Sequence, residues 1–192
     1  MKQFTRNDWL LKNFLGFALS YSIYSLLAHG YTGGHDYELS FAQFLTHTVA
    51  LLVVGSIVGV AQYSALSESY NLRSSKIIVV PLFFVAFFWI GYYLSGPPLD
   101  IILGFPVLGS VLWIFDDKIR KLTMPYKILA YCGFFCGALV GGMVLTLIDT
   151  QTGIIGKMQD SIGLHTIMWL ILALPTAVIG GWISGISIKK SL

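Results

Sequence analysis

The stretch FAQFLTHTVALLVVGSIVGVAQYSAL, residues 41–66, contains no Asp, Glu, Lys or Arg. An α-helix rises about 1.5 Å per residue, so a helix of this length exceeds the hydrocarbon core of a bilayer, which is about 30 Å thick. Two glycines and a glutamine, Gly55, Gly59 and Gln62, interrupt the apolar run. The stretch therefore predicts a membrane-spanning helix with one face that carries small and polar residues.

The composition of the whole chain also indicates a membrane protein. The chain of 192 residues is 56% hydrophobic and only 11% charged, with a mean hydropathy of +0.76, whereas soluble domains carry about 25% charged residues. No connection between apolar runs is long enough for a soluble domain, so we expect residues 1–192 to form a single transmembrane domain.

Runs near the length of a span recur six times, which predicts an all-α bundle of six transmembrane helices arranged as three hairpins. The predicted helices cover residues 9–28, 41–66, 77–94, 99–115, 126–148 and 162–188.

The basic residues predict the orientation, because short loops rich in Lys and Arg stay in the cytoplasm. With a cytoplasmic N terminus, every basic residue except Lys157 falls on the inner side. We therefore predict cytoplasmic N and C termini and a multi-pass protein of a bacterial-type inner cell membrane. The net charge of +3 follows from this asymmetry and does not indicate nucleic-acid binding.

The glycines predict close helix packing. Transmembrane helices associate through small residues that let backbones approach, and through interhelical hydrogen bonds. Gly55 and Gly59 share one face of their helix with Gln62, which can serve either as a polar contact between helices or as a solute contact. Gly133, Gly137 and Gly141 form a second stripe in the fifth predicted helix.

Other neutral polar side chains could contact a solute inside the bundle. Ser20, Ser22 and Tyr24 lie in the first predicted helix. No charged residue lies at the midpoint of any predicted span, which disfavours a proton-driven pump. Pro175 interrupts the sixth span and predicts a kink.

The four histidines, His29, His35, His47 and His165, all fall toward the predicted outer face. Imidazoles gathered at one face could bind zinc, copper or, through His47 and His165, a haem. The alternative is that loops and helix ends are simply polar, and no tight ligand spacing is present. The cofactor is therefore unknown from sequence.

GSIVGVAQYSAL, followed by Leu72-Arg73 and an aromatic helix that contains Trp89, resembles the G-x-x-x-G-x-x-Q-[aromatic] signature of a group of uncharacterised bacterial polytopic membrane proteins. In that group tryptophan usually follows the glutamine and Leu-Arg comes closely after it. This chain has Tyr63 instead, and its Leu-Arg pair is displaced. The resemblance implies a polytopic membrane protein and no activity.

Three function classes follow. The first is a transport or solute-binding membrane subunit, in contact with the lipid bilayer and with other membrane subunits. The second is a non-catalytic subunit or assembly factor of a larger membrane complex, and the third is an outer-face metal or haem redox protein. Known intramembrane protease motifs are missing from the sequence, which disfavours an enzyme.

Overall fold

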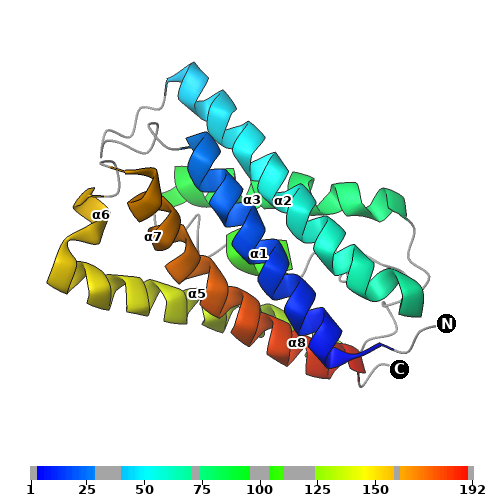
Figure 1. Ribbon diagram of the computed structural model, residues 1–192. Helices are drawn as coiled ribbons and strands as arrows, with labels where there is room; N and C mark the ends of the chain where they lie inside the picture. Colours follow the sequence, from blue (N-terminus) through cyan, green and yellow to red (C-terminus); the bar gives the residue numbers. More distant parts are fainter. Residues whose placement is uncertain are drawn as a thin grey trace.

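A computed structural model describes residues 4–28, 40–70, 74–95, 104–109, 124–157 and 161–189. These residues form helices and no strand (Figure 1). The elements are α1 (Arg6–Ala28), α2 (Phe41–Tyr70), η1 (Ser74–Ile78), α3 (Val79–Ser95), α5 (Met124–Thr152), α6 (Ile154–Lys157), α7 (Ile162–Pro175), η3 (Thr176–Gly180) and α8 (Gly181–Lys189). Residues 104–109 form a further short helix.

Four helical stretches are long and apolar enough to cross a membrane. They are Arg6–Ala28, Phe41–Ser67, Lys127–Thr152 and Ile162–Ile186. The shortest has 23 residues and is about 35 Å long, which exceeds the hydrocarbon thickness of about 30 Å. The all-helical class predicted from the sequence is confirmed, with four candidate spans in the described part of the chain.

The long helices extend beyond the apolar runs that predicted them. α1 begins at Arg6 rather than Trp9, because the Thr5 hydroxyl accepts a hydrogen bond from the Asp8 amide at 3.3 Å and caps the first turn. α5 ends at Thr152 rather than residue 148. Polar residues can continue a helix where it leaves the hydrocarbon, and hydropathy therefore underestimates its length.

The third predicted helix, 77–94, corresponds to a 3₁₀ turn followed by an α-helix. It opens as a 3₁₀ turn, η1, and becomes α-helical at Val79. Pro81 lies in the first turn of α3, where a missing amide hydrogen costs little. Of the fourth predicted helix, 99–115, only residues 104–109 are described; its other residues lie outside the described part.

The sixth predicted helix, 162–188, is divided by Pro175. The chain passes from α7 through a π-helical turn, η3, into α8. Proline cannot donate to the carbonyl one turn back, and its ring crowds that carbonyl, so a wider turn relieves both problems. The predicted kink is thus a local widening of the helix.

The helices pack around α1, which contacts α2 on one side and α7 and α8 on the other. α5 packs against α7, η3 and α8, and α3 packs against α2 (Figure 1). Stacked aromatic rings fill the middle of the bundle. Tyr21 lies 5.0 Å from Phe105 and 5.6 Å from Trp169 between ring centroids, and Phe17 lies 6.3 Å from Phe134.

One end of the bundle gathers the start of α1, the end of α2, the start of α5 and the end of α8. A buried cluster there joins these elements, and a Cβ on Gly185 of α8 would lie 2.8 Å from Arg6 Cγ of α1. The cluster consists of Phe4, Trp9, Ala65, Leu66, Ala130 and Ile188.

Candidate functional site

Gln62 occupies the centre of the most connected polar group in the bundle. Its side chain is fully buried, and its Nε2 donates to Asn13 Oδ1 at 2.9 Å and to the Gly109 carbonyl at 3.0 Å. Asn13, also fully buried, donates through Nδ2 to the Trp9 carbonyl at 2.9 Å. The glutamine therefore joins α1, α2 and the short helix 104–109.

These contacts fix the orientation of both amides. Exchanging the oxygen and nitrogen of Gln62 would place its oxygen against two acceptors, Asn13 Oδ1 and the Gly109 carbonyl. Exchanging those of Asn13 would place an oxygen against the Trp9 carbonyl. The remaining atom, Gln62 Oε1, is buried and has no hydrogen-bond partner among the described residues.

A buried acceptor without a donor is costly. Its desolvation costs about 1–3 kcal/mol, and nearly all buried polar groups in folded proteins have partners. Gln62 Oε1 is therefore a buried acceptor in the described bundle that calls for a hydrogen-bond donor from beyond the described residues.

The two predicted glycine faces contact neighbouring helices. A Cβ on Gly59 would lie 3.1 Å from Val80 Cβ, and one on Gly55 would overlap Pro81. On α5, a Cβ on Gly133, Gly137 or Gly141 would lie 2.6–2.8 Å from atoms of Ile183, Thr176 and Leu172, respectively. Both sets of glycines thus lie where neighbouring helices approach closely.

The predicted first-helix residues do not join Gln62. Ser20 donates to the Phe17 carbonyl at 3.0 Å and Ser22 to the Ala18 carbonyl at 2.8 Å, both within α1. Tyr24 lies eleven residues beyond Asn13, about 17 Å along the helix axis. Its hydroxyl lies 3.1 Å from His47 Nδ1. The structure therefore separates these residues into different environments.

A second polar group lies at the far end of α1. His165 is fully buried; its Nδ1 lies 3.3 Å from the Ser25 carbonyl and its Nε2 accepts from Trp169 Nε1 at 3.0 Å. A carbonyl only accepts and an indole N–H only donates, so these contacts define the neutral Nδ1–H tautomer. Both ring nitrogens are engaged, and binding a metal would break one of these hydrogen bonds.

The histidines do not form a metal centre within the described residues. No group of three or more His, Cys, Asp or Glu side chains there could hold a metal ion. His47 and His165 each have partners of their own, and the predicted ligands His29 and His35 lie outside the described part of the chain.

Sequence reasoning missed Asn13 as a partner of Gln62, and it missed the buried hydrogen bond from Trp9 Nε1 to Ser184 Oγ at 2.9 Å. Asn13 carries the same signal as Gln62, a neutral amide inside an apolar run. What the sequence lacks is the register between helices that brings two residues 49 positions apart into contact.

The fold and site define a helical protein with several apolar helices of membrane-spanning length and a buried amide network between them. No protein family, curated protein or solved structure matches this chain. The function is therefore inferred from the site.

Proposed function

We propose that this protein is a solute-binding or transport subunit of the cell membrane, and that its solute donates a hydrogen bond to Gln62 Oε1. The unpartnered buried oxygen carries this proposal. An oriented acceptor held by two further hydrogen bonds is pre-organised for a hydroxyl, amide or ammonium group. Polar groups inside a membrane-spanning bundle can mark a substrate pathway.

The proposed topology is a six-span bundle of three hairpins in a bacterial-type inner membrane, with both termini cytoplasmic. The start of α1 and the end of α8 lie at the same end of the bundle, which supports termini on one side. Lys12 and Lys127 lie toward that end, as the bias of basic residues toward the cytoplasm requires. As a transport subunit, the chain would work with other membrane subunits.

Labelling of introduced cysteines tests the topology. Cys132 and Cys136 are first replaced by alanine, and single cysteines are introduced at Gln151, beyond the outer end of the predicted fifth span, and at Ser74. A thiol reagent that cannot cross membranes is expected to label Gln151→Cys in intact cells and Ser74→Cys only after permeabilisation. Labelling of Ser74→Cys in intact cells would reverse the orientation.

Analysis of released small molecules tests the solute. Protein purified in mild detergent is denatured, and the molecules set free are identified and quantified by mass spectrometry. We expect about one donor-bearing molecule per chain from the native protein and a loss of at least about tenfold in Gln62→Leu, the effect of one buried hydrogen bond.

Gln43→Leu supplies the matched control, because it makes the same chemical change on the same helix. Gln43 lies at the start of α2, where its Oε1 accepts from the Ser40 amide at 2.8 Å. This variant should release as much as the native protein. Release of nothing but detergent and lipid from folded native protein would reject the proposed solute.

A further inference from the structure

A groove with a volume of about 520 Å³ runs between α1 and α2 on the outside of the bundle. Its residues are Lys12, Leu15, Gly16, Leu19, Ser56, Ile57, Val60, Ala61 and Ser64. The groove is hollow because small residues meet at its floor. A Cβ on Gly16 would lie 2.8 Å from Ala61 Cβ, so the helices touch there without side chains to fill the space above.

The interior of the groove suits a hydrocarbon chain. Leu15, Leu19 and Val60 are each more than half exposed and form its apolar rims. The two serines offer no free donor, since Ser56 Oγ donates to the Leu52 carbonyl at 2.7 Å and Ser64 Oγ to the Ala61 carbonyl at 2.8 Å. In a bilayer such a face meets lipid.

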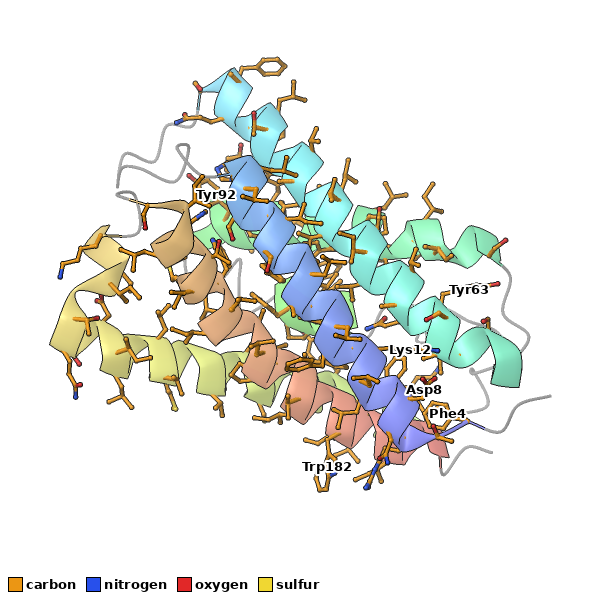
Figure 2. The ribbon with its side chains drawn as sticks, in the orientation of Figure 1. Phe4, Asp8, Lys12, Tyr63, Tyr92 and Trp182 are labelled. Carbon is orange, nitrogen blue, oxygen red and sulfur yellow. The ribbon has the colours of Figure 1, made fainter. Side chains whose placement is uncertain are left out.

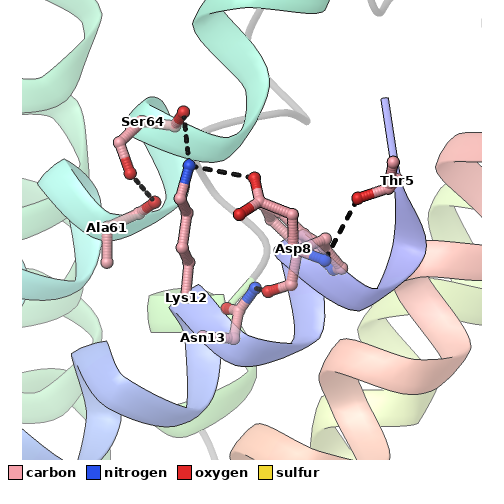
Figure 3. A network of polar contacts seen from close by, with 7 residues as sticks. Thr5, Asp8, Lys12, Asn13, Ala61 and Ser64 are labelled. Carbon is pink, nitrogen blue, oxygen red and sulfur yellow. Dashed lines mark hydrogen bonds and ion pairs between the residues drawn. The ribbon is translucent and has the colours of Figure 1, made fainter. Parts of the chain in front are cut away.

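One end of the groove carries a pair of opposite charges. Lys12 Nζ lies 2.9 Å from Asp8 Oδ2 and donates to the Ser64 carbonyl at 3.0 Å (Figure 3). An ammonium has three donors, and the described residues supply acceptors for two. The side chains of Lys12 and Asp8 are 30% and 41% exposed, so a headgroup can reach both.

Aromatic and basic residues place this end at the boundary of the hydrocarbon. Trp182 is 49% exposed, and the Arg6 guanidinium lies 5.8 Å from its ring centroid; tryptophan and basic residues mark membrane interfaces. Figure 2 shows Asp8, Lys12 and Trp182 toward the same end of the bundle. Lys12 lies six residues beyond Arg6, about 9 Å inward, within reach of the interface for a long flexible side chain.

We propose that this groove binds one acyl chain of a zwitterionic phospholipid, whose phosphate contacts Lys12 and whose primary ammonium contacts Asp8. The ion pair of the protein and that of the headgroup are complementary, and each charge gains a charge-assisted hydrogen bond. An anionic lipid without an amine would meet the Asp8 carboxylate, and a quaternary amine has no N–H to donate.

Native mass spectrometry of the purified full-length chain tests this assignment. The probes are phosphatidylethanolamine, phosphatidylglycerol and phosphatidylcholine with the same acyl chains. We expect one phosphatidylethanolamine to bind, with affinity about fivefold or more above the other two, as one additional charged hydrogen bond would give. Equal binding of all three lipids would overturn the proposal.

Two independent variants test the two parts of the site. Lys12→Met removes the charge, and Ser56→Phe fills the groove. Each should weaken phosphatidylethanolamine binding by about tenfold. Thr146→Phe is the matched control, because Thr146 is an exposed hydroxyl on α5 that donates to its own helix at 2.9 Å, and it should leave binding within about twofold. Unchanged binding in both test variants would overturn the proposal.

Asp8→Asn tests the headgroup preference. Without the carboxylate, phosphatidylglycerol should bind at least as well as phosphatidylethanolamine, since the repulsion of the phosphate is gone. A retained preference for phosphatidylethanolamine would reject the contact with Asp8. The same spectra report dimers, and a dimer that Ser56→Phe abolishes without any lipid dependence would assign the groove to a second copy of the chain.

Discussion

Replacing Gly137 by leucine is expected to remove nearly all folded, detergent-stable protein. A Cβ at this position would lie 2.6 Å from Thr176 Cα and 2.8 Å from the Pro175 carbonyl oxygen. Both atoms belong to backbone, which cannot rotate away as a side chain can. The leucine would force α5 away from η3 and so break the neighbouring close contacts at Gly133 and Gly141. We expect this overpacking to lower the free energy of unfolding by about 3 kcal/mol or more.

Gly142 supplies the control for this substitution on the same helix. A Cβ there would meet nothing within 4 Å, so Gly142→Leu should fold like the native protein or slightly better, because leucine favours a helix by roughly 0.8 kcal/mol over glycine. The stability of Gln62→Leu should fall between those of the two glycine variants, because each interhelical hydrogen bond lost costs about 0.6 kcal/mol.

Size-exclusion chromatography after heating gives the yield of each variant and its midpoint of thermal denaturation. Equal yields for Gly137→Leu and Gly142→Leu would show that the stripe formed by Gly133, Gly137 and Gly141 faces lipid in the membrane rather than α7, η3 and α8.

The helices could be predicted from the sequence because the bilayer imposes a length. Any apolar run of about 20 residues must satisfy its backbone internally, and a helix is the simple way to do so. The predicted ranges 9–28, 41–66 and 126–148 each fall inside a longer helix, since charge and polarity end a hydrophobic run before they end a helix. The π-helical turn after Pro175 could not be predicted, because a proline in a helix indicates a distortion but not whether that distortion is a kink or a wider turn.

Which residues of different helices contact each other could be predicted much less well. In a soluble protein the apolar face of a helix points inward, but a helix that is apolar on all sides gives no such sign. Gly55, Gly59 and Gln62 share one face of α2 by spacing, yet the two glycines approach Pro81 and Val80 of α3 while Gln62 contacts Asn13 of α1. Nothing in the sequence indicated either set of neighbours. Such contacts depend on rotation and register, which only the packed bundle defines.

Truncation of Phe134 to alanine is the other substitution expected to have a large effect. Phe134 is fully buried, and its ring fits between the bare backbone at Gly109 and at Gly180, where a Cβ on either glycine would overlap it. The ring therefore joins α5 to the short helix 104–109 and to the turn that Pro175 creates. Removing it leaves a cavity that rigid backbone cannot close.

We expect Phe134→Ala to lower the free energy of unfolding by about 3 kcal/mol, the low end for a buried Phe→Ala change. The low end applies because an unfolded helix in the bilayer holds its side chains in lipid, so the loss comes from packing rather than from transfer out of water. Phe87→Ala is the control, since Phe87 on α3 is 36% exposed, and it should cost less than about 1 kcal/mol.

Comparison of the two variants by thermal denaturation in the same detergent separates packing from a general loss of apolar surface, because both remove the same atoms. Phe134→Leu should recover more than half of the loss, since leucine refills most of the space between the two glycines. If Phe134→Ala and Phe87→Ala melted together, the ring would not be held between Gly109 and Gly180.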